Sequence, residues 1–405
     1  MRALPVFFAA PHRLMFLTGT VQALAAMVFW SLDVGAHYAG LWPAPAWPLL
    51  NLVPASLLHA LLISCGVFPP FIFGFILTAG PRWQGAGDLP QRDFVPAFLM
   101  QAAGWLLVWA ALLLPFLLVV GLALVLGGWT AVGLTLTRLA RFHAVEREHI
   151  VYVAVAAWLG AAGLGAFLAF AAGGGLLWAR FGVGLVVWGF LLPVFLTVAH
   201  RMLPFFTSSA VRGYVVRRPT WALRTLLGAS VMHGALSALE QPGWLWLADL
   251  PAMLAAGRLS WLWWSRKAMD NRMLAVLHVA FAWVAIAFAM FATQSLAWFA
   301  APGLLGQAPL HALTLGFFAS MLLGMASRVT MGHSGRPVVA DAAMWRAFCM
   351  MQAAAVLRVS SDLPALPGAH ALMWLSSLLW LGAFAFWAWR FAPAFWRPRA
   401  DGKPG

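Results

Sequence analysis

The chain carries little charge and almost no cysteine, and each scarcity excludes a class of protein. Asp, Glu, Lys and Arg make up only 9% of its 405 residues, against about 25% in an average soluble domain. Hydrophobic residues make up 63%, too many for a chain that folds in water. The two cysteines, Cys65 and Cys349, lie in apolar segments without a CxxC or CxxCH pattern. A disulfide framework and covalent c-type haem attachment are therefore excluded.

Acidic residues are scarcer than basic ones. The chain has 11 Asp and Glu residues against 25 Lys and Arg residues, a net charge of +14. In a membrane protein such an excess belongs to the cytoplasmic loops, so it predicts no nucleic-acid partner. Asp249 is the only acid well inside an apolar run, and Arg258 is its predicted partner. The sequence has no catalytic carboxylate pair and no Walker or HExxH motif.

Apolar runs long enough to cross a bilayer, which takes about 20 residues, fill most of the chain. They cover residues 14–36, 51–79, 95–113, 116–138, 150–171, 176–203, 222–239, 244–264, 273–299, 310–329, 342–361 and 369–390. The pattern predicts an all-α polytopic membrane protein of about twelve transmembrane helices, with residues 1–405 forming one transmembrane domain. A bend is expected at Pro69-Pro70, and the longest connection, 204–221, is expected to be a basic surface loop.

Basic residues alternate between connections in a way that predicts the orientation. All 25 Lys and Arg residues except Arg180, Arg258 and Arg358 fall before the first run or after an even-numbered one. This positive-inside pattern predicts that both termini are cytoplasmic. The opposite connections carry tryptophan and proline instead, for example Trp42 and Trp47, as expected of an interfacial aromatic belt.

Two histidines share a local sequence. The tetrapeptide Leu-His-Ala-Leu occurs around His59 and again around His311, near the start of two even-numbered runs. Imidazoles from two helices can hold a metal ion or a b-type haem, so both are predicted cofactor and metal ligands. The alternative is that each hydrogen-bonds a neighbouring helix. His59 lies about eight residues into its predicted run, whereas His311 lies at the start of its own, which places them at different depths.

A second group of polar residues is expected at the cytoplasmic side. Arginine beside glycine at a helix end suits an anion such as a haem propionate, a phosphate head group or a quinone oxygen. The predicted cofactor-binding residues of this group are His200, Arg201, His278, Arg328, His333 and Arg336. The remaining histidines on basic segments, His12, His143 and His149, are interpreted as ordinary interfacial residues.

Residues 311–337, HALTLGFFASMLLGMASRVTMGHSGRP, closely resemble the signature of the NnrS family. Small residues recur within this stretch at Gly316, Ser320 and Gly324 and predict a close helix contact. Three further segments are similar to family patterns, namely FILTA followed by Pro81 and Trp83, RMLPFFT at 201–207, and the LH to W segment at 277–283.

The resemblance implies a twelve-span protein of the bacterial inner membrane that contains haem and copper and is tied to nitric oxide and nitrosative stress. One segment departs from the family pattern HxHEM. From His59 this chain has His-Ala-Leu-Leu-Ile instead, which weakens the expectation of copper and leaves haem b as the favoured cofactor. The matched histidines are His59 and His311 on the outer side and His278 and His333 on the inner side.

The expected function is nitric oxide handling by a membrane haem protein that transfers electrons or reduces nitric oxide as a haem-dependent oxidoreductase. A quinone, a membrane redox partner or a second copy of the chain are the expected partners besides the bilayer. The alternative is a non-catalytic accessory or assembly subunit of a respiratory complex. A transporter ranks last, because the sequence shows no inverted repeat.

Overall fold

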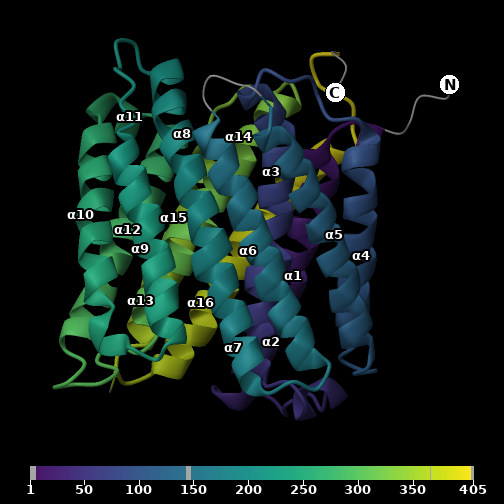
Figure 1. Cartoon of the computed structure of the whole chain (residues 1–405), viewed down its shortest axis with the longest axis vertical. Helices are drawn as coiled ribbons and strands as arrows, with labels where there is room; N and C mark the ends of the chain where they lie inside the picture. The colour runs from purple at the N-terminus through teal and green to yellow at the C-terminus, as the bar shows by residue number, and fades with distance from the viewer. Residues whose placement is uncertain (1–5, 143–146, 365, 403–405) are drawn as a thin grey trace.

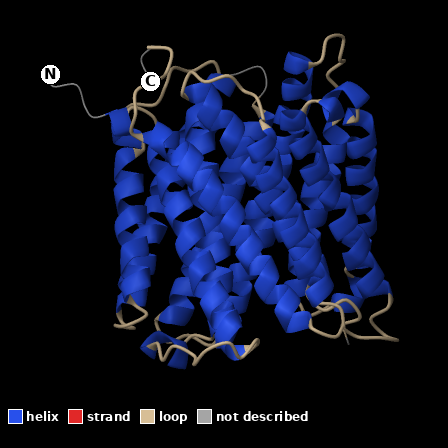
Figure 2. Ribbon diagram, turned by 180° about the vertical axis from the view of Figure 1, so that it is seen from behind, coloured by secondary structure: helices blue, strands red, loops and turns tan. Residues whose placement is uncertain are grey.

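The computed structural model describes residues 6–142, 147–364 and 366–402, and these residues form helices and connections without a strand. The helices stand side by side as a bundle, with the connections gathered at its two ends (Figures 1 and 2). Because a helix satisfies its own backbone hydrogen bonds, this is one of the two architectures that can cross a bilayer.

Eight helices in the described chain are long and apolar enough to cross a membrane. They are α1 (Pro11–His37), α2 with η3 and α3 (Ala55–Trp83), α5 (Leu117–Ala140), α6 (Glu148–Ala171), α7 with η5 and α8 (Leu176–Ala210), α12 (Arg272–Leu296), α13 with η7 and α14 (Ala308–His333), and α16 with η8 (Ala369–Phe395). The chain is therefore a polytopic, all-helical membrane protein, as predicted.

Four further helices that are shorter or less apolar belong to the same bundle. They are α4 (Val95–Ala110), α9 (Thr220–Ala238), α10 (Trp246–Trp263) and α15 (Ala342–Ser361). α4 packs on α5, α10 packs on α9 and α12, and α15 packs on α16. The short α11 (Arg266–Asp270) connects α10 to α12. Each predicted apolar run coincides with one of these helical stretches.

Three of the long helices contain a π-helical segment. These are η3 (Leu62–Val67), η5 (Val186–Leu191) and η7 (Ala312–Ala319). The predicted bend at Pro69-Pro70 was misplaced, because the irregular turn is η3 and both prolines lie in the first turn of α3 (Phe68–Trp83), where a missing N–H is tolerated. π-helical turns inside α-helices are frequent at functional sites.

The predicted loop at 204–221 was too long. The helix α8 (Leu192–Ala210) continues through Pro204, so the connection shrinks to residues 211–219. The inner face of α8 buries Leu203, Phe206 and Thr207. The Thr207 hydroxyl donates to the Leu203 carbonyl at 2.9 Å. Packing of this face outweighs the one hydrogen bond that a proline removes.

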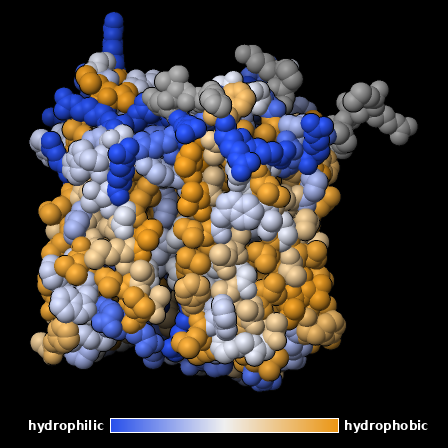
Figure 3. All heavy atoms as spheres, in the orientation of Figure 1, coloured by the Kyte–Doolittle hydropathy of each residue, from blue (hydrophilic) through white to orange (hydrophobic). Residues whose placement is uncertain are grey.

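The two ends of the bundle differ in charge. The beginning of α1 and the chain's C-terminal segment meet at one end, where the backbone N–H of Ala400 donates to the carbonyl of Ser334. Hydrophilic atoms form a band across this end, at the top of Figure 3, above a largely apolar wall. We call this end the basic end. The opposite end, where α2 and α13 begin, is called the far end (Figure 1).

Small residues allow neighbouring helices to approach closely. A side chain on Gly316 would meet the ring of Trp283 at 2.3 Å, and one on Gly324 would meet Val276 at 2.7 Å. The predicted seam of the tenth run therefore packs against α12. Such contacts are the usual means of helix association in lipid, where the hydrophobic effect between helices is absent.

Candidate metal centre

His59 and His311 line one cavity near the far end of the bundle. His59 is the fifth residue of α2 (Ala55–Leu61) and His311 the fourth of α13 (Ala308–His311). The predicted depth difference between them was wrong, because residues 48–51 form a separate 3-10 turn and the helix begins only at Ala55.

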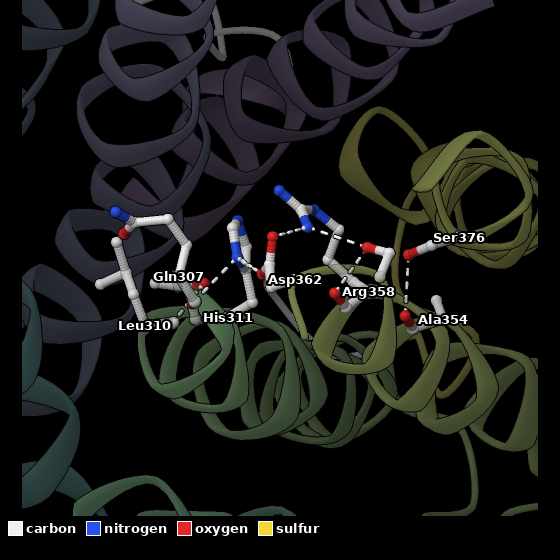
Figure 4. Close-up of polar contacts among 9 residues, drawn as sticks. Gln307, Leu310, His311, Ala354, Arg358, Asp362 and Ser376 are labelled. Atoms are coloured by element: carbon white, nitrogen blue, oxygen red, sulfur yellow. Dashed lines mark hydrogen bonds and ion pairs between the residues drawn. The ribbon is translucent and has the colours of Figure 1, made fainter. Parts of the chain in front are cut away.

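His311 is held in one orientation by its neighbours. Its Nδ1 lies 2.6 Å from Oδ2 of Asp362 and 3.1 Å from the carbonyl oxygen of Gln307. Both partners are acceptors, so Nδ1 carries the proton and Nε2 keeps a free lone pair. Metal-binding histidines typically donate their second N–H to a carboxylate in this way. Figure 4 shows Asp362 lying between His311 and Arg358.

Asp362 receives a second charged partner on its other side. The guanidinium of Arg358 forms an ion pair with Asp362 and donates from Nη1 to the Ser361 hydroxyl at 3.0 Å. Burial alone would raise the pKa of the Asp362 carboxyl, but the hydrogen bond from His311 and the Arg358 charge hold this pKa below its ordinary value. The carboxylate is therefore ionised while it accepts the hydrogen bond from Nδ1 of His311.

His59 has the opposite environment. Its Nδ1 is buried and has no hydrogen-bond partner among the described residues. Trp30 of α1 stacks on the imidazole, with ring centroids 4.1 Å apart and an angle of 21° between the planes. A buried polar atom without a partner is costly, and a bound ligand would remove that cost. His59 thus brings to the wall of the cavity an imidazole whose Nδ1 has no partner among the described residues.

The repeated tetrapeptide has a structural counterpart. His311 directly precedes η7, and His59 lies three residues before η3. Residues of both π segments line the cavity, among them Ser64 and Thr314, and η5 contributes Val187. The three interrupted helices of the bundle thus converge on one site.

The size of the cavity limits what it can hold. It is partly open and measures about 130 Å³, close to the roughly 150 Å³ of a cavity that binds benzene. Sites for drug-sized molecules measure roughly 300–1,000 Å³, and a haem macrocycle belongs to that larger class. In this conformation the cavity has room for a metal ion with a small ligand, and it is smaller than the sites that hold molecules of haem size.

Its ligand atoms are few and soft. No group of three or more His, Cys, Asp or Glu residues suitable for a metal ion occurs in the part of the chain that the structure describes. The cavity instead combines the imidazoles of His59 and His311 with the thioethers of Met27 and Met373. Imidazole and thioether together are typical of copper(I) sites.

Two histidines of the cytoplasmic group predicted from the sequence hydrogen-bond to other parts of the protein. His200 donates from Nε2 to the Pro219 carbonyl at 3.2 Å, so its Nδ1 accepts from Nε2 of His149 at 3.1 Å. His278 donates from Nε2 to the Thr207 hydroxyl at 3.1 Å. Each of these histidines therefore already has a protein partner.

Two arginines of that group contact aromatic rings at the basic end. Arg201 lies 4.9 Å from the ring centre of Trp83, and Arg328 lies 4.0 Å from that of Phe206. Arg328 also donates from Nη2 to the Ser209 hydroxyl at 3.4 Å, so it meets the same end of α8 as His278 does. Arg336 follows the end of α14, and none of the group lines the cavity of His59. His311 and His333 are 22 residues apart on one helix, about 33 Å, so they cannot share a ligand.

Two histidines interpreted as interfacial are in fact buried. His12 is 4% exposed, and its ring lies 4.5 Å from that of His333. His149 is 7% exposed and pairs with His200 as described above. The error arose because the basic residues around them indicated a surface, whereas both lie in the first turn of a helix that packs inward. His143 lies outside the described residues.

Sequence reasoning also missed partners of the two central ligands. Asp362 and Trp30 carried no signal in the sequence, whereas Arg358 stood out as a basic residue outside the cytoplasmic connections. The predicted pair of Asp249 and Arg258 was wrong. Asp249 lies 2.7 Å from Nδ1 of His233, and Arg258 instead lies 4.5 Å from the ring centre of Trp261.

A family model described as NnrS protein matches residues 6–399, nearly the whole chain. The chain belongs to the NnrS family. A comparison with curated proteins finds no match. Three residues of this NnrS protein replace the second His, the Glu and the Met of the HxHEM pattern, and they have different surroundings. Leu61 and Leu62 are fully buried, whereas Ile63 lines the cavity. Position 63, where the pattern has methionine, therefore presents an isoleucine to the cavity.

Proposed function

We propose that this NnrS protein handles nitric oxide in the bacterial inner membrane, at a metal centre held by His59 and His311. One observation carries the proposal. A histidine oriented by a carboxylate and a histidine with an orphaned nitrogen line the same cavity. Nitric oxide itself follows from the family, because no residue of the site specifies it.

The cavity suits a small neutral molecule. Trp30, Phe68 and Trp380 form much of its wall, and an apolar wall imposes no desolvation cost on an uncharged diatomic gas. Such a gas also crosses the bilayer without a polar channel. Arg358, the basic residue at the cavity, is neutralised by Asp362, so no free charge disfavours a neutral ligand.

Copper fits the residues better than haem b does. The donors are His59, His311, Met27 and Met373, and their softness compensates in part for the lost HxHEM residues. A copper ion here would supply an open coordination position for nitric oxide. Asp362 would hold His311 in the required tautomer, and Trp30 would hold the His59 ring in place. Haem b would need the cavity to widen.

The test is a metal analysis of detergent-purified protein. Copper, iron and pyridine haemochrome are measured on the wild type, His59→Ala and His311→Ala, with His278→Ala as the matched control. We expect about one copper per chain in the wild type and the control, and loss of copper in both site variants. Addition of nitric oxide to the reduced protein should then change the spectrum of the wild type and the control only.

Two outcomes would contradict the proposal. In the first, the wild type contains haem and both site variants lack it. His59 and His311 would then be ligands of haem b and not of copper. A protein that contains neither copper nor haem after growth in sufficient metal would overturn the metal centre and favour an accessory subunit.

We also propose that residues 1–405 form one transmembrane domain with twelve crossings and cytoplasmic termini. The helices α4, α9, α10 and α15 have 16 to 20 residues, or about 24–30 Å, and lie alongside the eight longer helices. The positive charge at the basic end supports the orientation. A C-terminal green fluorescent protein fusion should fluoresce, and a C-terminal alkaline phosphatase fusion should be inactive.

A further inference from the structure

A second, larger cavity of about 580 Å³ opens at the far end between α7 (Leu176–Leu185) and α9. Its wall is mostly apolar, and the lining side chains of Leu177, Phe181 and Val231 are exposed at the surface of the bundle. Figure 3 shows this face hollowed in its lower half, with hydrophilic atoms in blue beside the hollow. An exposed apolar hollow on this surface faces the lipid.

Two opposite charges line this cavity without meeting. Arg180 lies on α7 and Glu240 just beyond the end of α9. The two form no ion pair with each other, and neither side chain has a hydrogen bond or ion pair with any described residue. Both side chains are exposed at the far end of the bundle, where a charged head group can reach them.

Glu240 occupies a position that normally belongs to glycine. Its φ is +54°, and it is the only non-glycine residue of the described chain with a positive φ. The N–H of Glu240 donates to Ser237 and that of Gln241 donates to Leu236, the hydrogen-bond pattern of a Schellman helix end, where glycine is usual. A charged side chain is therefore held at this helix end in a backbone conformation that costs a non-glycine residue free energy.

Gly184 leaves space for an occupant. A side chain added there would meet no atom within 4 Å, although the residue lines the cavity. Behind the cavity Trp188 closes the wall and stacks on His233 at 3.7 Å. The hollow therefore ends at a fixed aromatic surface.

We propose that this cavity binds a zwitterionic phospholipid with a primary amine head group, of the phosphatidylethanolamine class. The phosphate pairs with Arg180 and the ammonium group pairs with Glu240, while an acyl chain lies along Leu177, Phe181 and Val231. An anionic lipid would leave Glu240 opposed by like charge. A quinone is neutral and would leave both charges unpaired, so charge complementarity favours the zwitterion.

The experiment is native mass spectrometry of the full-length protein in detergent, titrated separately with phosphatidylethanolamine, phosphatidylglycerol and phosphatidylcholine. We expect phosphatidylethanolamine to bind about fivefold more tightly than phosphatidylglycerol, the contribution of one exposed ion pair. Phosphatidylcholine, whose quaternary amine cannot donate a hydrogen bond, should bind more weakly.

Three substitutions separate the parts of the site. Gly184→Leu should occupy the part of the cavity one turn from Arg180 and weaken binding, whereas Gly257→Leu, at a helical glycine that also faces open space, should bind as the wild type does. Arg180→Gln should weaken both phosphatidylethanolamine and phosphatidylglycerol. Glu240→Gly should remove only the preference for phosphatidylethanolamine, and it should raise the melting temperature because glycine accepts the positive φ.

Several results would overturn the inference. Equal binding of phosphatidylethanolamine and phosphatidylglycerol to the wild type would remove the role of Glu240. Unchanged lipid binding by Gly184→Leu would place the lipid elsewhere. Displacement of the lipid by an isoprenoid quinone would identify the ligand as a quinone, and a dimer that dissociates on Gly184→Leu would identify the occupant as a second copy of the chain.

Discussion

The imidazole of His311 and the carboxylate of Asp362 meet at 2.6 Å although 51 residues separate them in the sequence. His311 ends the first turn of α13, and Asp362 immediately follows α15. The contact fixes a proposed metal ligand by tying the far ends of two helices together. The orientation of the ligand therefore depends on the connection between α15 and α16, which lies outside the cavity itself.

Asp362→Asn should weaken copper binding without removing either ligand. The oxygen of an amide accepts a weaker hydrogen bond from Nδ1 of His311 than a carboxylate does. Loss of such a carboxylate partner typically costs about 10–100-fold in metal affinity. Competition with a copper(I) chelator would measure the effect. Asp88→Asn, at an exposed carboxylate, makes the same change in charge and should retain full affinity. Equal affinity in both variants would contradict the role of Asp362.

Acid should destabilise the protein partly through the same carboxylate. The pKa of Asp362 is held below its ordinary value by His311 and Arg358. Folding therefore favours the ionised form, and this contribution is present above the unfolded pKa, near 3.9, and is lost as pH falls through the lower folded pKa. Below about pH 4 the melting temperature of the wild type should fall more steeply than that of Asp362→Asn. Parallel profiles would show that the carboxylate contributes nothing.

The sequence predicted the helices well because membrane spans depend on local composition. Each apolar run coincides with a helical stretch, and the eleventh predicted run, 342–361, agrees with α15 at both ends. The failures concern single helix turns. Pro204 suggested a helix end but lies inside α8, since tertiary packing maintains the helix. No composition rule signals a π-helical segment, so the irregular turn was placed at the prolines.

The site was predicted only in part. His59 and His311 were found through a repeated tetrapeptide, which in the structure precedes η3 and runs into the start of η7. Their partners, Trp30 and Asp362, come from other helices, and a contact across such sequence distance leaves no local pattern. The pairing of His12 with His333 was hidden for the same reason. Whether the predicted residues bind a cofactor stays a prediction.

Arg13 should hold the C-terminal segment to the bundle. Its Nη1 lies within 3.0–3.3 Å of the carbonyl oxygens of Ala394, Phe395 and Arg397, and the side chain is almost fully buried. Hydrogen bonds from a charged donor contribute about 1.5–3 kcal/mol. In Arg13→Ala, hydrogen exchange at residues 392–402 should accelerate by at least about tenfold, the equivalent of 1.4 kcal/mol.

The control for this prediction is Arg92→Ala, at an exposed arginine on the same end of the bundle. Its exchange over residues 392–402 should match the wild type, because Arg92 has no hydrogen bond or ion pair with any described residue of that segment. If Arg13→Ala also exchanged at the wild-type rate, the C-terminal segment would be held by its apolar contacts alone, chiefly through Phe395 and Trp387.

Gly104 and Gly121 should be the least replaceable residues of the contact between α4 and α5. A side chain on Gly104 would lie 2.6 Å from the carbonyl oxygen of Gly121, and one on Gly121 would lie 2.7 Å from that of Gly104. These obstacles are backbone atoms, which cannot rotate away, so Gly104→Ala must push the helices apart. Overpacking of this kind costs about 1–3 kcal/mol, and the melting temperature in detergent should fall.

The control is Gly228→Ala, at a helical glycine that faces open space. It should leave the melting temperature unchanged or slightly higher, because alanine favours the helix. A wild-type melting temperature for Gly104→Ala would mean that α4 is free to move, and α4 would then contribute little to the stability of the bundle.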